Sequence, residues 1–353
     1  MARRYGYTVR EWERLSERDA EQRRTTRKLA AVLALMAVIV LALLYGVYYF
    51  GIRSHDYSLR VPFDKDNAVF GIPGDIAVTD TAPGFASNLC VTDRDIGGGL
   101  ISLDAYSAGL YDMTGTEILY SRDAFTKRSP ASLTKIMTAL VTLKYGNLDD
   151  IVTVTDTAKD IEFGSSVCDI KTGDQLTLRQ LLYGMMIASG NDASMMIAEH
   201  VGGSVAQFVR MMNDEARSLG ATRTQFTNPH GLTDSEHYTC VYDLYLMFHE
   251  AMKYDIFLDV ISRINYYAEY RNAQGNAVAV TWESTNHYFT GEASLPDNVI
   301  VFGGKTGTTD DAGACLALLA KDLYGNPYLA LILHANDKDQ LYVEMNRLLT
   351  LIE

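Results

Sequence analysis

The chain of 353 residues has few metal-binding residue types: four cysteines and seven histidines. The cysteines are Cys90, Cys168, Cys240 and Cys315. No two of them form a Cys-x-x-Cys pair, so neither a zinc site nor thioredoxin-like redox chemistry is supported. His249-Glu250 is not followed by a second histidine three residues later, which excludes the metalloprotease helix motif. Internal repeats and low-complexity segments are also absent. We therefore expect no metal and no organic cofactor.

The chain also lacks an excess of positive charge, because 31 Lys and Arg face 44 Asp and Glu. Residues 1–28 carry nine basic and five acidic residues, and residues 29–51 carry none of either kind. The remainder therefore holds 22 basic (31 − 9) and 39 acidic (44 − 5) residues, a net charge of −17. So acidic a surface argues against nucleic acid as a partner. Solubility is a sufficient explanation of the charge.

Leu29 to Phe50 is a run of 22 residues without charge, long enough to cross a bilayer as a helix. A cleaved signal peptide would have a shorter apolar stretch, and a buried core helix would usually keep a polar face. The run ends in an aromatic cluster suited to the membrane interface. We predict a cytoplasmic basic tail (1–28), a transmembrane anchor (29–50), an extracytoplasmic stalk (51–85) and a catalytic domain (86–353). The positive-inside rule sets this single-pass orientation.

The pattern of the catalytic domain is strands, then helices, then strands, then a helix, which is typical of an α+β fold. A hairpin is predicted around 113–115, and helices over 132–145, over 178–187 (capped by Thr177), from 191 to 200, and from a Ser204 cap to Gly220. Further strands are predicted on both sides of 272–276 and over 299–308, 312–320 and 327–335. A closing helix is expected from 337 to 352.

Three short motifs follow one another in this domain: Ser132-Leu-Thr-Lys135, Ser189-Gly-Asn191 and Lys305-Thr-Gly307. Each is weak alone, but the trio is typical of enzymes that form a serine ester, although Asp commonly stands where Gly190 does. Ser132 and Lys135 share one face of the expected helix, so the amine can take the hydroxyl proton. Lys135 can act as that base only if burial or a neighbouring cation, such as Lys305, lowers its pKa.

The sequence resembles the low-molecular-mass penicillin-binding proteins, specifically the serine-type D-alanyl-D-alanine carboxypeptidases. The segments that carry the resemblance are Pro130–Ala139, Ser189–Ala193, Phe226–Leu232 and Gly304–Thr308. The resemblance begins near Gly109 and implies an antiparallel sheet flanked by helices, with an inserted all-helical lobe and the site between them. Many relatives carry a further C-terminal β domain, for which we expect no room here.

The resemblance also implies roles for the motif residues. Ser132, Lys135 and Ser189 are the expected catalytic residues, with Ser189 passing protons toward the leaving group. Substrate binding is expected from Asn191, Lys305, Thr306, Gly307 and Thr308. Of these, Asn191 would bond the substrate amide, and Lys305 and Thr306 would hold its terminal carboxylate. Gly307 would let the substrate approach the strand, and the N–H groups of Thr308 and Ser132 would form an oxyanion hole.

The expected reaction is hydrolysis of the terminal D-Ala-D-Ala bond of a peptidoglycan pentapeptide at the bacterial cell membrane, with β-lactams as covalent inhibitors. A β-lactamase is the first alternative, but residues 222–229 lack the glutamate such enzymes use for deacylation. A non-enzymatic β-lactam receptor is the second, and 28 cytoplasmic residues are too few for an output domain. The organism, the third residue of the stem peptide, added endopeptidase activity and the oligomeric state stay open.

Six further residues have expected roles outside the three motifs. His230 is interpreted as a residue that orders its loop, with substrate contact as the alternative, and Asp192 and Asp243 as structural carboxylates. By the resemblance, the segments of Cys168 and Cys240 both border the cleft, so we predict a disulfide between them. Cys315 lies in an apolar strand and is predicted to be a buried free thiol.

Overall fold

A computed structural model of the protein describes Met36, Val40, Tyr45 and residues 88–352. The chain divides into two units, residues 1–79 and 80–353, and the fold below is that of the second unit. Among the described residues, no helix is both long and apolar enough to cross a membrane. The predicted tail (1–28), most of the predicted anchor (29–50) and the predicted stalk (51–85) lie outside the described residues.

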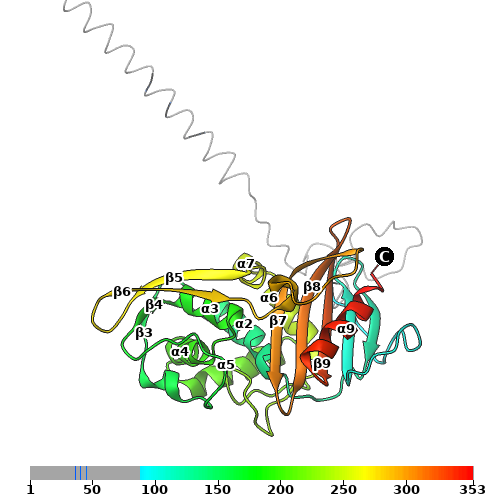
Figure 1. The fold of residues 1–353 in the computed structure, drawn as a ribbon, viewed down its shortest axis with the longest axis horizontal. Helices are drawn as coiled ribbons and strands as arrows, with labels where there is room; N and C mark the ends of the chain where they lie inside the picture. The colour runs from blue at the N-terminus through cyan, green and yellow to red at the C-terminus, as the bar shows by residue number, and fades with distance from the viewer. Residues whose placement is uncertain (1–35, 37–39, 41–44, 46–87, 353) are drawn as a thin grey trace, which may run out of the picture. The chain divides into compact units, whose positions relative to one another are not determined.

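A five-stranded antiparallel sheet is formed by segments from both ends of the unit (Figure 1). Its strands are β1 (Ser107–Asp112), β2 (Glu117–Arg122), β7 (Val299–Thr309), β8 (Gly313–Asp322) and β9 (Pro327–Ala335), in the spatial order β2-β1-β9-β8-β7. The predicted hairpin and the last three predicted strands are confirmed. β7 is an edge strand, so one of its sides has no strand partner in the sheet.

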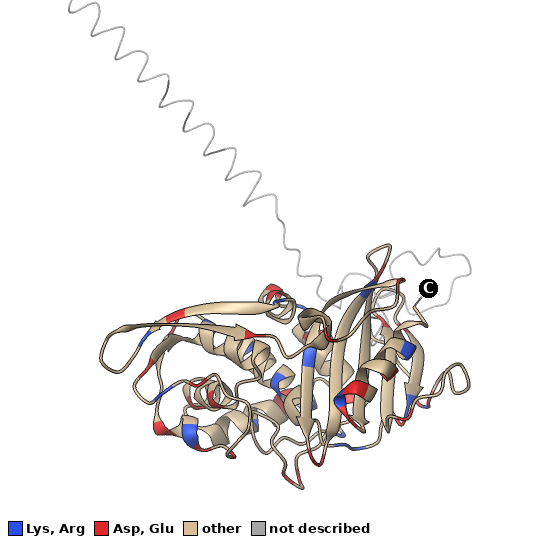
Figure 2. Ribbon diagram, viewed as in Figure 1, with Lys and Arg blue, Asp and Glu red and all other residues tan. Residues whose placement is uncertain are grey.

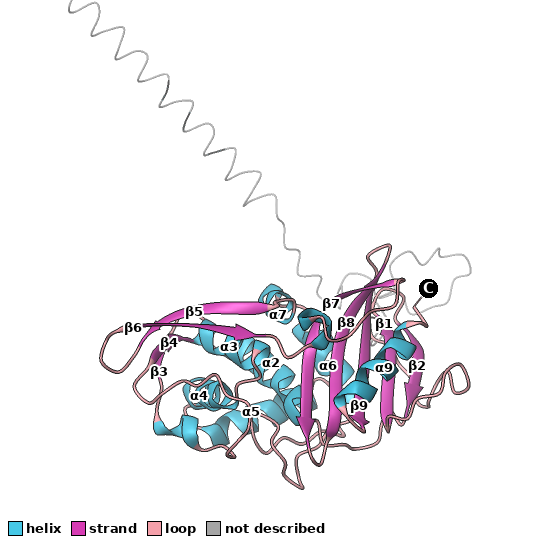
Figure 3. Cartoon of the chain, in the orientation of Figure 1, coloured by secondary structure: helices cyan, strands magenta, loops and turns pink. Residues whose placement is uncertain are grey.

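The sheet is buried on both faces, because its strands alternate between two apolar clusters. On β8, Leu316 and Leu318 pack toward the closing helix α9 (Lys338–Leu349), whereas Ala317 and Leu319 belong to the larger cluster. That larger cluster also contains the buried face of α6 (Val241–Ala251), which contacts β1 and β9. The helix α9 therefore lies against one face of the sheet and α6 against the other (Figures 1 and 3).

Residues 123–298 are inserted between β2 and β7 and contain most of the helices (Figure 3). The helical elements of this insertion are η3 (Ala131–Leu133), α2 (Thr134–Tyr145), η4 (Asp156–Lys159), α3 (Leu178–Ile187), α4 (Asn191–Gly202), α5 (Val205–Ser218), α6, α7 (Asp255–Ile261) and α8 (His287–Thr290). The helices α6, α7 and α8 were not predicted. We call α2 to α5 the helical lobe.

The expectation of an all-helical lobe was wrong. A second antiparallel sheet, in the order β3-β4-β5-β6, packs on α3. Its strands are β3 (Ile151–Thr153), β4 (Gln175–Thr177), β5 (Asn265–Arg271) and β6 (Ala277–Glu283). The β5–β6 hairpin around 272–276 was predicted, but β3 and β4 have three residues each, too few to show a period of two.

Side-chain caps set the starts of several helices where the sequence predicts them. Thr177 forms a capping box with Gln180 at α3, and the Ser204 hydroxyl accepts from the Gln207 N–H at α5. Asp337 caps α9 in the same way. The chain between α3 and α4 cannot continue as a helix because Ser189 has φ of 59°. This break brings Ser189 and Asn191 to the end of the lobe that faces β7.

Candidate active site

The nucleophile segment is a tight turn and not the first turn of a long helix. Ser132 lies in the short 3-10 helix η3, and α2 begins at Thr134, two residues later than predicted. Ala131 has φ of 47°, a region that costs a non-glycine residue about 1–3 kcal/mol. The turn is held by the Thr134 hydroxyl, which donates to the Ala131 carbonyl at 2.8 Å. Strained backbone therefore presents Ser132.

Lys135 is fully buried and its side-chain nitrogen lies within hydrogen-bond distance of three oxygen atoms. Its Nζ lies 2.8 Å from Ser132 Oγ, 2.6 Å from Asn191 Oδ1 and 2.9 Å from the His230 carbonyl oxygen. A neutral amine has two N–H donors and one lone pair. With the donors on Asn191 and His230, the lone pair is directed at the Ser132 hydroxyl. The neutral form of Lys135 is therefore placed to accept the Ser132 proton.

The environment favours that neutral form. Burial lowers the pKa of Lys135 well below its usual range, and the positive charge of Lys305 lowers it further. The condition that the sequence set for Lys135 as a base, a pKa lowered by burial or by a neighbouring cation such as Lys305, is therefore met.

Ser189 and Asn191 stand in the break between α3 and α4. The Ser189 hydroxyl accepts a hydrogen bond from Lys305 Nζ at 2.9 Å, which links this break to β7. Asn191 directs its Oδ1 at Lys135, which leaves its amide N–H groups for another acceptor. Between them, Gly190 has no room for a side chain, because a Cβ would lie 2.3 Å from the Cys168 sulfur. The close contact with Cys168 therefore explains why position 190 is a glycine in this chain.

The third motif lies on the edge strand β7. Lys305 is buried, and burial lowers its pKa to about 7. The Thr306 hydroxyl is 2.5 Å from that of Thr285. A Cβ on Gly307 would lie 2.9 Å from the Ser132 backbone nitrogen. Glycine here therefore permits close contact between β7 and the nucleophile turn.

Asp192 and Asp243, which we interpreted as structural carboxylates, accept hydrogen bonds that connect separate segments of the chain. Asp192 Oδ1 accepts from the N–H groups of Cys168 and Ala193, both at 2.8 Å, and this anchors the loop before β4 to the start of α4. Asp243 Oδ2 accepts from the Arg223 N–H at 2.8 Å and the Thr224 hydroxyl at 2.7 Å.

His230 orders its own loop, as one of its two interpretations expected. Its Nδ1 accepts from the Leu232 N–H at 3.1 Å, and its carbonyl oxygen accepts from Lys135. Burial lowers the pKa of the imidazole to about 3, so the ring is neutral. The contribution of its backbone carbonyl to the Lys135 site was not foreseen.

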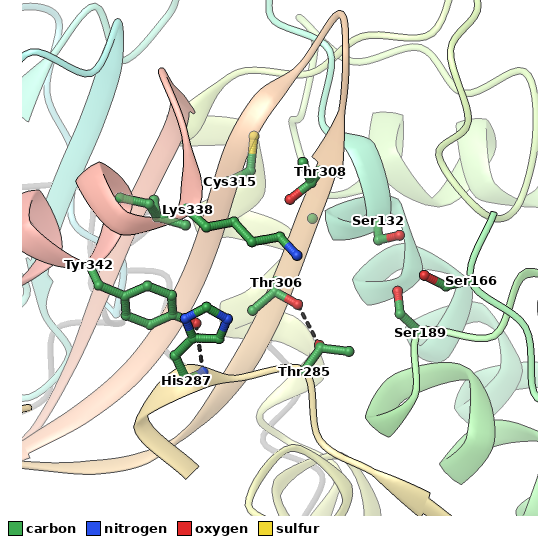
Figure 4. Close-up of a pocket in the computed structure, with 12 residues that line it drawn as sticks. Ser132, Ser166, Ser189, Thr285, His287, Thr306, Thr308, Cys315, Lys338 and Tyr342 are labelled. Carbon is green, nitrogen blue, oxygen red and sulfur yellow. Dashed lines mark hydrogen bonds between the residues drawn. The ribbon is translucent and has the colours of Figure 1, made fainter. Parts of the chain in front are cut away.

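Two cavities meet at Ser132. The first, which we call the Lys338 pocket, has a volume of about 100 Å³ and lies between β7, the nucleophile turn and the start of α9. Ser132, Ser189, Thr306, Gly307 and Thr308 line it together with residues that sequence reasoning missed. The missed residues include Ser166, Thr285, His287, Lys338 and Tyr342. Figure 4 shows the hydroxyls of Ser132, Ser166 and Ser189 facing one another, and the Lys338 side chain extending toward them.

The second cavity, which we call the Glu162 pocket, has a volume of about 360 Å³. It continues from Ser132, Asn191 and Thr308 toward Glu162 and Asp310. All eight predicted site residues therefore either line these two cavities or bond directly to a residue that does. No sequence motif marked Ser166, Lys338, Glu162 or Asp310, because each comes from a separate segment. Within the described part of the chain, no group of three or more His, Cys, Asp or Glu residues could hold a metal ion.

The predicted disulfide between Cys168 and Cys240 was wrong, because all four cysteines are buried free thiols. The Cys168 sulfur packs against Gly184 and Gly190, and its carbonyl accepts from Trp282 Nε1 at 3.2 Å. Cys240 instead precedes α6, next to Asp243. Burial raises the pKa of both thiols, so both stay protonated at neutral pH. The prediction for Cys315 as a free buried thiol is confirmed.

Comparison with known proteins identifies the family of this chain. Residues 97–336 match the family Peptidase_S11, D-alanyl-D-alanine carboxypeptidase. The chain is 33% identical over 223 residues to D-alanyl-D-alanine carboxypeptidase DacF of Bacillus subtilis, covering 62% of this chain and 54% of the relative. It is 34% identical over 260 residues to DacC of Escherichia coli, covering 70% and 61%. The chain thus spans little more than half the length of these curated relatives.

Among solved structures, the Streptomyces K15 DD-transpeptidase is similar with a TM-score of 0.65 and 28% identity, covering 71% of this chain and 97% of that one. The carboxypeptidase DacD of Francisella tularensis is similar with a TM-score of 0.62 and 26% identity, covering 76% and 75%. The chain belongs to the D-alanyl-D-alanine carboxypeptidase family, Peptidase_S11.

Proposed function

We propose that this member of the D-alanyl-D-alanine carboxypeptidase family hydrolyses the terminal D-Ala-D-Ala bond of peptidoglycan stem peptides through an ester on Ser132. The observation that carries the proposal is the 2.8 Å contact between Ser132 Oγ and Lys135 Nζ, at a lysine whose pKa burial and Lys305 lower. A base of this kind is what a serine hydroxyl needs to become a nucleophile.

Acylation begins when Lys135 takes the Ser132 proton and Oγ attacks the penultimate D-alanine carbonyl carbon. Negative charge develops on the carbonyl oxygen, where the N–H groups of Ser132 and Thr308 would receive it. The C–N bond then breaks. The departing D-alanine amine takes a proton from Lys135, with Ser189 as the relay and Lys305 holding the Ser189 hydroxyl.

Recognition of a free carboxylate explains the concentration of positive charge on the leaving-group side. Lys305 is buried behind Thr306, and Lys338 lies in the wall of the Lys338 pocket. The terminal carboxylate of the substrate would lie between the Thr306 hydroxyl and these cations. Once D-alanine has left, water enters at the same place. Lys135 removes its proton, and hydrolysis of the ester restores the Ser132 hydroxyl.

A β-lactam would acylate the same serine, but its ring-opened fragment stays tethered and blocks the path that D-alanine vacates. No glutamate from residues 222–229 offers a second approach for water. We therefore propose that β-lactams are slow-turnover inhibitors, and that β-lactamase activity is absent as a main function.

We further propose that residues 29–50 anchor the protein in the bacterial cell membrane, with residues 1–28 cytoplasmic and the catalytic domain 86–353 outside, after the stalk 51–85. The charge-free run and the nine basic residues before it support this arrangement. Protease added to intact cells should degrade residues 52–353 and spare the basic tail. A catalytic domain that is protected until the membrane is broken would contradict the orientation.

The activity is tested with the full chain in detergent. A pentapeptide that ends in D-Ala-D-Ala should lose one alanine residue, as measured by mass, and labelled penicillin should form an ester on Ser132. Rapid, steady hydrolysis of penicillin at a rate rivalling peptide cleavage would favour the β-lactamase alternative.

A further inference from the structure

The two cavities that meet at Ser132 have opposite charge. The Lys338 pocket is lined by Lys338 and contains no Asp or Glu among its described lining residues. The Glu162 pocket is lined by Glu162 and Asp310 and contains no Lys or Arg among its described lining residues. A ligand that spans both cavities therefore meets a cation at one end and two carboxylates at the other.

The carboxylates of the Glu162 pocket are not neutralised by neighbours. Within the described residues, neither Glu162 nor Asp310 has an ion-pair partner. The lysines that flank the loop of Glu162 are engaged elsewhere: Lys159 pairs with Asp156 at 2.6 Å, and Lys171 pairs with Asp169. Both pocket carboxylates are exposed and come from different segments, the loop 160–168 and the end of β7.

The direction of β7 determines which part of a bound substrate lies in the Glu162 pocket. The terminal carboxylate is assigned to Lys305 and Thr306, and the scissile carbonyl to Ser132 and Thr308. The substrate chain upstream of that carbonyl must then run on past Thr309 to Asp310, antiparallel to β7. A residue of extended chain advances about 3.3 Å, so the residue before the acyl D-alanine lies beside this end of the strand.

We propose that Glu162 and Asp310 bind the free side-chain ammonium of a diamino acid at the third position of the stem peptide. The inference rests on the proposed function, because it assigns the acyl part of that substrate to the Glu162 pocket. It names the substrate class as peptides with an uncapped amine two residues before the terminal D-alanine. A peptide whose amine has been acylated loses the positive charge and adds bulk in the same place.

The test compares two tripeptides on the full chain in detergent: Nα-acetyl-L-Lys-D-Ala-D-Ala, and the same peptide with both amines acetylated. We expect kcat/KM to be about three- to tenfold higher for the free amine at low salt, the scale of two exposed ion pairs. The preference should shrink as sodium chloride is raised, because exposed charges are screened. In Glu162→Gln with Asp310→Asn it should fall to about one. Glu269→Gln, an exposed carboxylate on β5, is the matched control and should keep the full preference.

Three outcomes would overturn the inference. They are equal kcat/KM for both peptides in the wild type, an unchanged preference in the double variant, and a Glu162→Gln variant that slows both peptides equally. The last result would mean that the carboxylate acts on water and not on the amine. Labelled penicillin lacks this ammonium, so an ester on Ser132 of the double variant shows that the nucleophile is still reactive. If neither tripeptide loses D-alanine, the proposed function itself fails, which is a separate result.

Discussion

The two walls of the cleft use opposite kinds of backbone. The helical wall, residues 131–135 and 188–191, holds Ser132 and Ser189 on irregular turns, with positive φ at Ala131 and at Ser189 itself. The sheet wall, Lys305–Thr308, pairs with β8 in a regular antiparallel register, beyond the register shift between Val301 and Gly303. The reacting hydroxyls therefore come from strained turns, whereas the groups assigned to substrate binding, apart from Asn191, come from a regular edge strand. Strain concentrates where an atom must be presented at one angle.

Each wall also needs a glycine and has a buried thiol behind it. Gly190 has the Cys168 sulfur against it, and Gly307 pairs with Cys315 across the sheet while pressing on the Ser132 nitrogen. The walls are joined directly by the bond from Lys305 to Ser189. The following changes separate the contributions of the two walls. Figure 2 marks the positions of Lys and Arg in blue and of Asp and Glu in red along the ribbon.

The largest effect should come from the helical wall. Ser132→Ala removes the nucleophile, so labelled penicillin should leave no covalent adduct, as measured by mass spectrometry of the intact protein. A matched Ser165→Ala variant, in the neighbouring loop, should label normally. A labelled Ser132→Ala protein would show that another serine is the nucleophile.

Lys135→Ala should slow penicillin acylation by about 10² or more, the usual scale of general base catalysis. The loss should exceed that of Lys144→Ala, which lies about two and a half helical turns further along α2 and whose ammonium pairs with Glu215 at 2.7 Å. Rapid-quench labelling measures both rates. Equal rates for Lys135→Ala and wild type would remove Lys135 from the role of base.

Gly307→Ala tests the contact between the walls. The new Cβ would lie 2.9 Å from the Ser132 nitrogen, so β7 and the nucleophile turn must separate. Overpacking of this kind costs about 1–3 kcal/mol, and acylation should slow by about tenfold or more. Gly98→Ala, where a Cβ meets nothing within 4 Å, is the control for both thermal stability and acylation. Unchanged acylation in Gly307→Ala would show that the contact is not needed.

The pH dependence tests the sheet wall. Lys305 binds a carboxylate only when protonated, and its pKa is lowered to about 7 by burial. Its charge is therefore lost as the pH rises through 7, so kcat/KM for a carboxylate-ended peptide should fall above that pH, approaching tenfold per unit. Lys305→Arg keeps its charge, so its alkaline limb should move to higher pH. If kcat/KM of this variant fell over the same pH range as that of the wild type, the group that titrates would not be Lys305.

The smallest expected effect concerns the thiols. Because Cys168 and Cys240 are not bridged, a reducing agent should leave the thermal midpoint unchanged. Four thiols per chain should react with a thiol reagent in denaturant, with or without prior reduction. A midpoint that falls on reduction would show a disulfide after all.

Much of the fold was predictable because its elements are long and periodic. The strands β7, β8 and β9 and the helix α9 were predicted within three residues at each end, since apolar runs between turn residues define them. The strands β3 and β4 were missed because three residues carry no period. The packing of the second sheet on α3 was missed because strand pairing depends on contacts between distant segments.

The sequence by itself determined the order of the three motifs, the residue types that make an ester on serine feasible, and the helix caps, because these depend on neighbours a few residues apart. Only the tertiary structure decided the lowered pKa of Lys135, since burial and Lys305 act on it across 170 residues. The same holds for the free state of Cys168 and Cys240 and for the placement of Lys338 and Glu162 at opposite ends of the cleft. The effects of neighbouring charges and of burial depend on which residues lie close together in space, and a local sequence pattern does not contain this information.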